Sequence, residues 1–384
     1  IGKPADYVGP VLEKNYDMAL VGAEGNLLPI NQTEYWINPA NPKTKSFVLS
    51  MLSEIVKNYD VDGIQLDYIR NPFQSKYNLM GFDPVGRQKF EIETGCSLDK
   101  INDSTLELWN NWKTKQISNI VKEISLNLRK IKPDILISAA VYPGSRYNRI
   151  NSINQDWETW VENGWIDILN PMIYSSNKDK LLENIIYISK SINNKAFIYP
   201  GISVKNLEDA DLLEYIYTIK DAGLLGNTLF AMVHLNQKKS ELLSAGPYRY
   251  KDALIPSKDP IASAKILIKE YLAGLYALKS SSGNNSALYD MFINTLIDES
   301  KKVDKYISNL SDQSSFNETE KALNMLYRLQ EYTQNCVTND CKAKSIRSKL
   351  LGAYLKEASS LIYFKQHKQN LKELSNSSCE NVLY

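Results

Sequence analysis

The chain has 384 residues, of which 43% are hydrophobic and 23% are charged, and its formal net charge is +1. This composition is typical of a soluble protein of one or two domains. The near-zero charge argues against a nucleic-acid or membrane-surface partner, and no apolar run approaches the roughly 20 residues of a membrane span. Two histidines and four scattered cysteines argue against a structural zinc site, and we expect neither a metal nor a cofactor.

A helix is the first strong element, in the stretch "NPANPKTKSFVLSMLSEIVKNYD". Asn41 can cap its N-terminus, and Pro42 suits the first helical position because its backbone angle is already helical. Apolar residues then recur at the spacing of one helix face from Val48 to Tyr59, which predicts an amphipathic helix.

The stretch "VDGIQLDYIRNP", residues 61–72, follows as a short apolar strand with an acid at its end. Because side chains alternate along a strand, Gln65 and Asp67 share one face, and Ile64 and Leu66 share the other. An unpaired charge buried among helices would be costly, so we expect Gln65 and Asp67 to face a site.

The same pattern of a polar residue, an apolar run and polar or proline residues recurs further along the chain. It occurs in "DILISAAVYPGSR", "DILNPMIYSS", "KAFIYPGIS" and "NTLFAMVHLN", whose starts are 33, 28 and 32 residues apart. Helical stretches lie between them, so the spacing predicts repeated βα units. Such units allow either a (β/α)8 barrel or an open doubly wound sheet.

The barrel is the better interpretation. Polar side chains follow the strand ends, as they do at the active-site face of a barrel, and the glycine motifs of nucleotide-binding sheets are absent. Only five such strands can be counted, whereas a barrel has eight. We therefore expect an α/β chain, a TIM-type barrel that lacks its first βα units here, followed by an all-α C-terminal region.

The character of the chain changes near residue 242. The passage "SAGPYRYKDALIPSKDP" is typical of a linker, and the residues after Pro260 contain no proline, no tryptophan and only three glycines. We predict a barrel domain over 1–248, a linker over 249–261 and a helical domain over 262–384. The helical domain can serve in packing or bind a protein partner, whose identity the sequence leaves open.

Several motifs resemble the bacterial glycosyl hydrolase-like family 10. They are "NYDVDGIQLDYIRNPF", "SAAVYPGSRYNRINSINQDWETWVENGWIDILNPMIYSS" and "IYPGIS", in the order and at the intervals of that family. The resemblance implies a TIM-type barrel that acts on a glycan, with cell-wall strands among the glycans associated with relatives. It also implies an exported or cell-envelope location, and three βα units upstream of the segment that matches Ile1.

Asp67 is the candidate catalytic acid, because catalytic groups emerge at the tips of barrel strands. Its structural alternative is an ion pair with Arg70. Relatives often carry a second acid directly after the first, where this chain has Tyr68. The similar strand of family-18 chitinases has an Asp and a Glu where this chain has Gln65 and Ile69, so their mechanism lacks its acid here.

Glycoside hydrolysis usually needs a second carboxylate about 5–9.5 Å from the first, and no other strand tip carries one. Asp156 and Glu158 lie at a helix start, where capping and the helix dipole explain them, and Glu24 lies in an early loop. The second acid can also lie upstream of Ile1.

Side chains able to bind a sugar accompany the strand ends. Trp36, in "EYWINP", offers a flat face for a sugar ring, with a hydrophobic plug as the alternative, and the five other tryptophans are predicted core anchors. The predicted substrate-binding residues are Trp36, Asn38, Arg70, Tyr142, Arg146, Asn170, Tyr174 and His234.

Two functions fit these observations. The first is a glycoside hydrolase that uses Asp67. The second is a carbohydrate-binding or scaffolding protein that kept the barrel and lost the chemistry, which Tyr68 and the missing second acid favour.

Cys336 and Cys341 could form a disulfide in an oxidising compartment, and two free helix cysteines are the alternative.

Overall fold

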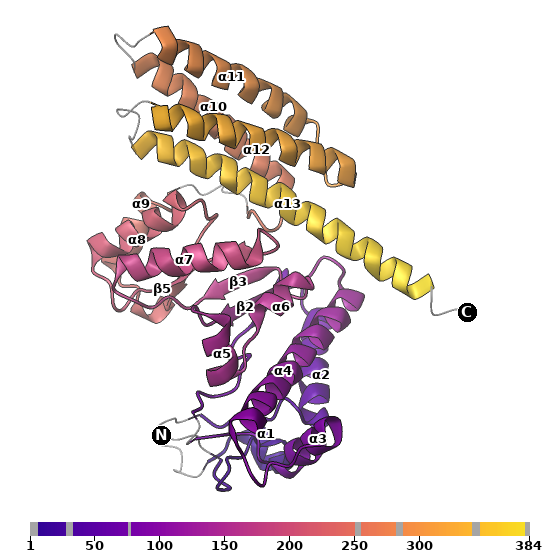
Figure 1. The fold of residues 1–384 in the computed structure, drawn as a ribbon. Helices are drawn as coiled ribbons and strands as arrows, with labels where there is room; N and C mark the ends of the chain where they lie inside the picture. The colour runs from indigo at the N-terminus through magenta and orange to yellow at the C-terminus, as the bar shows by residue number, and fades with distance from the viewer. Residues whose placement is uncertain are drawn as a thin grey trace. The chain divides into compact units, whose positions relative to one another are not determined.

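The computed structural model describes residues 7–27, 34–75, 78–249, 255–281, 287–339 and 346–380. The chain divides into two compact units, unit 1 over residues 1–168 and unit 2 over residues 169–384. Each unit combines helices with short parallel strands, so the chain is α/β, as predicted (Figure 1). The predicted linker over 249–261 stays a prediction.

Unit 1 contains the predicted first helix, α2 (Pro42–Asn58). Asn41 caps it, because its side-chain oxygen accepts a hydrogen bond from the Lys43 backbone N–H at 2.9 Å. α2 packs against the long helix α4 (Asp103–Ile131). The other helices of unit 1 are α1 (Pro10–Lys14), η1 (Tyr16–Met18), α3 (Pro84–Thr94), α5 (Arg146–Ile153) and α6 (Trp157–Glu162).

The strand pair of unit 1 consists of β1 (Gly63–Leu66) and β2 (Leu136–Val141). The two strands are parallel, with Gln65 opposite Ser138 and Leu66 opposite Ala139. Leu66 is buried, whereas Gln65 and Asp67 are exposed, which agrees with the predicted alternation.

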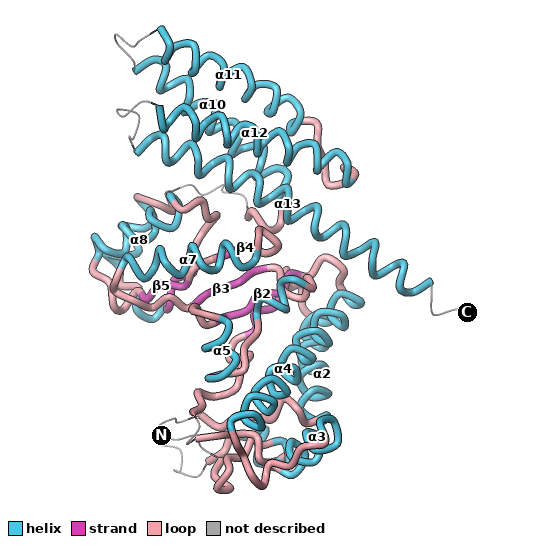
Figure 2. The backbone as a smooth tube through the Cα atoms, viewed as in Figure 1, coloured by secondary structure: helices cyan, strands magenta, loops and turns pink. Residues whose placement is uncertain are grey.

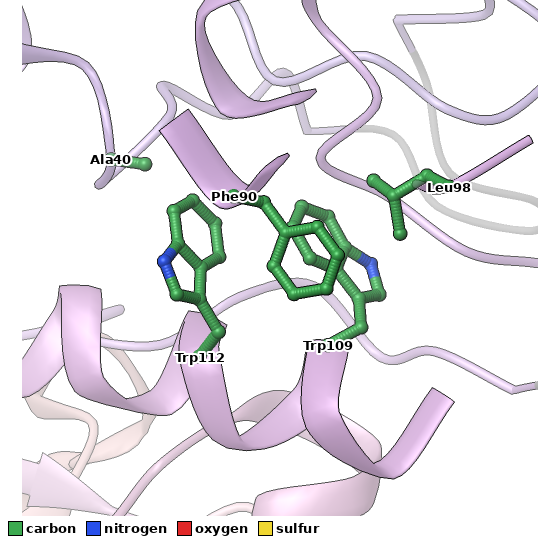
Figure 3. Close-up of a cluster of buried hydrophobic side chains, with 5 residues drawn as sticks. All are labelled: Ala40, Phe90, Leu98, Trp109 and Trp112. Atoms are coloured by element: carbon green, nitrogen blue, oxygen red, sulfur yellow. The ribbon is translucent and has the colours of Figure 1, made fainter. Parts of the chain in front are cut away.

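Aromatic rings form the core between α3 and α4 (Figure 3). The Trp109 and Trp112 rings stack with their centroids 5.0 Å apart, and the Phe90 ring meets each of them edge-on. Both tryptophans are almost fully buried, so the prediction that they anchor the core is confirmed.

Unit 2 begins with βα elements, whose strands are among the short magenta segments of Figure 2. The stretch "KAFIYPGIS" forms two strands, not the one predicted, because Pro200 has no N–H to donate to a ladder. β5 pairs in parallel with β6. The elements are β3 (Ile168–Pro171), α7 (Lys178–Ile192), β4 (Phe197–Ile198), β5 (Gly201–Ser203), α8 (Asp209–Asp221), β6 (Thr228–Phe230), η2 (Met232–His234) and α9 (Gln237–Ala245).

Four long helices complete unit 2, in the region predicted to be all-α. Figure 1 shows them side by side, with α10 against α11 and α13, and α12 against α11 and α13. They are α10 (Pro260–Ser281), α11 (Ala287–Ser308), α12 (Phe316–Asn339) and α13 (Ile346–Glu380). The side chains of Cys336 and Cys341 lie outside the described residues, so their disulfide stays a prediction.

α13 also packs on the βα elements of unit 2. Lys356 Nζ donates to the Ala222 carbonyl at 2.7 Å, where α8 ends, and the Phe364 ring lies 4.1 Å from the Phe197 ring. The helical region is therefore joined to the βα part of unit 2 by packing as well as by the chain. None of the described helices combines the length and the apolar character of a membrane-spanning segment.

Candidate functional site

Asp67 lies directly after β1, and its side chain is exposed. Its carboxylate accepts one hydrogen bond, from the Tyr68 backbone N–H at 2.8 Å. Tyr68 has a φ of 52°, a left-handed conformation that is uncommon for a residue other than glycine. No ion pair joins Asp67 to Arg70 among the described residues, so the carboxylate remains open to a ligand.

Arg70 lies among four aromatic rings. Its guanidinium carbon is 5.0 Å from the Trp36 centroid, 5.1 Å from Tyr68, 5.2 Å from Phe73 and 5.3 Å from Tyr142. Each distance is within the range of a cation–π interaction. Arg70 Nη1 also donates to the Asn71 carbonyl at 3.0 Å. We call these four rings and Arg70 the aromatic cluster.

Burial lowers the pKa of Arg70, and the nearby Tyr142, Tyr68 and Asp67 oppose this shift. The guanidinium is thus partly removed from water and is held mainly by ring faces. A group fixed in this way is preorganised for recognition, since few of its rotamers remain to be lost on binding.

Two rings of the aromatic cluster are exposed, and neither belongs to a predicted substrate-binding residue. Tyr68 is 55% exposed and Phe73 is 42% exposed, whereas Trp36 is only 8% exposed. Trp36 packs with Leu20 and Met80, which favours the hydrophobic-plug alternative over an open sugar platform. The most exposed residues of the aromatic cluster are therefore Tyr68 and Phe73.

The candidate second acids of α6 are held by arginines. Asp156 accepts hydrogen bonds from Arg146 Nε and Nη2 at 2.8 and 2.6 Å. Burial alone would raise the pKa of Asp156, but hydrogen bonds from Arg146 and Thr159 outweigh it and lower the pKa. Glu158 pairs with the buried Arg149. Both acids, and Arg146 with them, are thus engaged in structural pairs.

The contacts of Asn38 differ from those expected of a substrate-binding residue. It is 3% exposed, its Nδ2 donates to both Asp83 carboxylate oxygens at 2.8 Å, and its Oδ1 accepts from the Ala40 N–H at 2.8 Å. Burial raises the pKa of Asp83, against hydrogen bonds from Gly86 and Asn38 that lower it. Asn38 therefore holds the loop before α2 to the N-terminus of α3.

Unit 2 brings together other predicted residues. Asn170 Nδ2 donates to Thr228 Oγ1 at 2.8 Å, which links β3 to β6. The ring of Tyr174 stacks on Phe230, with their centroids 5.0 Å apart. His234 is half-buried in η2. Asn170 and Tyr174 thus make one polar and one aromatic contact with β6.

A cavity of about 10 Å³ lies inside unit 1, beside Trp109 and Lys113. It is far smaller than the about 300–1,000 Å³ of a ligand pocket, so it is too small to hold a ligand of ordinary size. No group of three or more metal-ligating side chains occurs in the ranges that the structure describes.

Residues 25–218 match the family described as glycosyl hydrolase-like 10, and this stretch is just over half of the chain. The chain belongs to the glycosyl hydrolase-like 10 family. The resemblance found in the sequence motifs is therefore confirmed. The matched stretch includes β1, Asp67 and the whole aromatic cluster.

Curated relatives are similar at low identity. The glycosyl hydrolase YngK of Bacillus subtilis is 22% identical over 170 residues, which are 41% of this chain and 30% of YngK. The glycosyl hydrolase DigH of Escherichia coli K12 is 22% identical over 154 residues, 36% of this chain and 31% of DigH. The chain thus matches less than a third of the length of these relatives.

Two further likenesses are more distant. An S-layer-related protein of Niallia circulans is 22% identical over 191 residues, which are 45% of this chain and 10% of that protein. The solved PgaB (BpsB) glycoside hydrolase domain from Bordetella bronchiseptica aligns with a TM-score of 0.47 and 8% identity, covering 56% of this chain and 64% of that domain.

Proposed function

We propose that the chain is the main part of a glycoside hydrolase domain that cleaves a glycan, with Asp67 as a catalytic carboxylate. The observation that carries this proposal is the exposed Asp67 carboxylate, which is paired with no side chain in the described residues and stands beside the aromatic cluster. Membership in the glycosyl hydrolase-like 10 family supports it.

The proposed fold is a TIM-type barrel, and the proposed substrate is a cell-wall glycan met outside the cytoplasm. Alternating helices and parallel strands support the barrel, because this connectivity places the strand ends on one face. In a barrel Asp67 lies at that face, where Tyr68 and Phe73 can stack on sugar rings. Arg70 and Tyr142 are the proposed donors to sugar hydroxyls.

A carbohydrate-binding protein without catalysis is the second candidate. It is favoured by the structural pairing of Asp156 with Arg146 and of Glu158 with Arg149, which leaves Asp67 without a partner acid on α6. This candidate predicts glycan binding with no turnover.

The two candidates are separated by the variant Asp67→Asn in the full-length protein. The amide keeps the shape of the carboxylate but cannot ionise, so a hydrolase should lose turnover of cell-wall or storage glycans by about 10²- to 10⁴-fold. Glycan binding and the melting temperature should stay close to wild type. Asp60→Asn is the matched control, because Asp60 is an exposed acid at the other end of the same strand region.

Turnover by Asp67→Asn at the wild-type rate would show that Asp67 is not catalytic. Binding of glycan by wild type with no detectable release of sugar would select the second candidate. Unfolding of Asp67→Asn, with Asp60→Asn unaffected, would assign Asp67 a structural role.

A further inference from the structure

A loop of unit 1 carries most of the proposed site. Residues 67–75 contain Asp67, Tyr68, Arg70 and Phe73, and the loop has no helix or strand of its own. Because such a loop has no regular backbone ladder, its conformation must be set by contacts with its neighbours. The contacts that set it lie at the end of α5.

Two buried amides follow α5. Asn154 caps the C-terminus of the helix in the left-handed conformation, with φ 56° and ψ 39°, which asparagine tolerates better than most residues. Asn154 and Gln155 are both 0% exposed. A fully buried amide must find partners for its N–H groups and its oxygen, or it costs about 1–3 kcal/mol.

The Asn154 side chain forms hydrogen bonds both with the 67–75 loop and with the backbone of α4 and α5. Its Oδ1 accepts from Asn71 Nδ2 at 2.9 Å and from Gln74 Nε2 at 2.8 Å. Its Nδ2 donates to the carbonyls of Asn110 and Ile150 at 3.2 and 2.8 Å. All the hydrogen-bonding capacity of this side chain is used, and half of it is directed at the loop.

The backbone reinforces the same junction. The Asn71 N–H donates to the Ile153 carbonyl at 2.9 Å, and the Gln74 N–H donates to the Ser152 carbonyl at 2.8 Å. The loop is therefore held to the end of α5 at two points on its backbone. Asn71 comes directly after Arg70, and Asn71 and Gln74 lie on either side of Phe73.

Gln155 joins the loop to the end of β2. Its Nε2 lies 3.3 Å from the Ile69 carbonyl, between Tyr68 and Arg70, and its Oε1 accepts from the Tyr142 N–H at 2.8 Å. The Tyr142 ring packs edge-on against Phe73 at 4.9 Å. One side chain thus sets the spacing of the two segments that bring the aromatic cluster together.

We propose that Asn154 and Gln155 are positioning residues that hold the 67–75 loop and Tyr142 in the arrangement of the site. Neither side chain reaches the surface, so neither can touch a glycan. Their consequence for turnover rests on the proposed function, whereas their effect on the loop does not. Misplacement of a reacting group by about 1 Å can cost about 10²-fold in rate, which makes such residues significant.

The test uses Gln155→Met and Asn154→Gly in the full-length protein. Met keeps the volume of Gln155 but can neither donate nor accept as an amide does, and Gly keeps the left-handed backbone of position 154 while removing its side chain. Ser118→Ala is the control for stability. It removes the hydrogen bond from Trp160 Nε1 at 2.8 Å, a buried contact of α4 with α6.

Amide hydrogen exchange is the first measurement. In Gln155→Met we expect the Tyr142 amide to exchange at least about tenfold faster, because it loses its hydrogen-bond acceptor. In Asn154→Gly we expect a similar increase at the Asn71 and Gln74 amides, because the side chain that supports this part of the loop is gone. Ser118→Ala should leave all three amides protected. Unchanged protection in both variants would overturn the proposal, whether or not the protein hydrolyses glycans.

Kinetics are the second measurement. Both variants should lower kcat by about tenfold or more. Ser118→Ala should leave kcat unchanged, even if it lowers the melting temperature by the same amount. A loss of kcat in Ser118→Ala as large as in Gln155→Met would reduce the two amides to a general structural role. A wild type without turnover would defeat the proposed function and leave the exchange result standing.

Discussion

The two units differ in the kinds of side chain that they bury. Unit 1 buries amides and a lysine next to the proposed site, among them Asn154, Gln155 and Lys113. The helical region of unit 2 packs mainly leucine, isoleucine and alanine, with Leu326, Leu355 and Ile362 almost fully buried, and Glu357 is a buried acid among them. Hydrogen bonds are directional and apolar packing is not, so the first interior specifies position while the second supplies mainly stability.

This difference fits the work proposed for each unit. A loop that carries a catalytic group must be held at a defined distance and angle, which a network of hydrogen-bonded amides can do. A bundle that supports its neighbours needs only a large apolar contact area. Substitutions in each interior test whether the two units differ in this way.

The largest effect is expected from the aromatic core of unit 1. Trp109→Ala should lower the free energy of unfolding by about 3–5 kcal/mol, because it empties the space between Phe90 and Trp112. Binding of glycan should be lost with it. The matched variant in unit 2, Leu326→Ala, should be destabilising while glycan binding persists.

Urea denaturation and glycan-affinity measurements check both variants. Equal loss of binding in Leu326→Ala and Trp109→Ala, under conditions where the remaining protein is folded, would show that the two interiors do not serve separate roles.

Local rules predicted the parts of the fold that depend on neighbours in sequence. The Asn41 cap and α2 follow from a capping residue and helical periodicity, and the alternation along β1 follows from the geometry of a strand. The all-α C-terminal region follows from the absence of proline and the scarcity of glycine after Pro260. Pro200 carried a signal that was overlooked, since a proline cannot continue a ladder between β4 and β5.

The site was harder to predict, because its supports are distant in sequence. Asn154 and Gln155 look like ordinary loop residues, and only the tertiary structure buries them against residues 67–75. The amide side chain of Asn38 is suited to bind sugar hydroxyls, but it is buried against Asp83. Tyr68 and Phe73 could have been selected, since both are aromatic and both follow Asp67 within six residues.

Lys113 offers a sharper test of the interior of unit 1. Its Nζ donates to the Gln74 side-chain oxygen at 2.5 Å and to the Met80 carbonyl at 3.4 Å, and no carboxylate pairs with it in the described part of the unit. Burial lowers the pKa of Lys113 from 10.5 to about 7. Between these two values the unfolded chain binds more protons than the folded one, so the free energy of unfolding should rise with pH.

The expected slope is at most about 1.4 kcal/mol for each pH unit between pH 7 and 10. Lys113→Met should remove it and should raise stability most below pH 7, where the buried charge is present. Chemical denaturation from pH 6 to 10 measures this, with the exposed Lys115→Met on the same helix as control. An unchanged slope in Lys113→Met would mean that Lys113 stays charged in the folded protein.

Glu357 provides the opposite case, in α13 of unit 2. It is 4% exposed, and its Oε1 has no hydrogen-bond partner in the described residues. Burial raises the pKa of Glu357 from 4.5 to about 8, although Lys220 and Lys356 act to lower it. Between these values the folded protein binds more protons than the unfolded chain, so the free energy of unfolding should fall as pH rises. The fall should be about as steep as the rise expected for Lys113, because the two pKa values shift by similar amounts in opposite directions.

Glu357→Gln keeps the shape of the side chain and removes the charge, so stability should no longer decline between pH 5 and 8 and should exceed that of wild type above pH 8. Melting followed by helical circular dichroism from pH 5 to 9 tests this, with the exposed Glu320→Gln on α12 as control. A decline that persists in Glu357→Gln would assign the pH dependence of unit 2 to other groups. Stability should no longer decline with pH in Glu357→Gln and should no longer rise with pH in Lys113→Met. Both results together would show that the stabilities of the two units respond to pH with opposite sign.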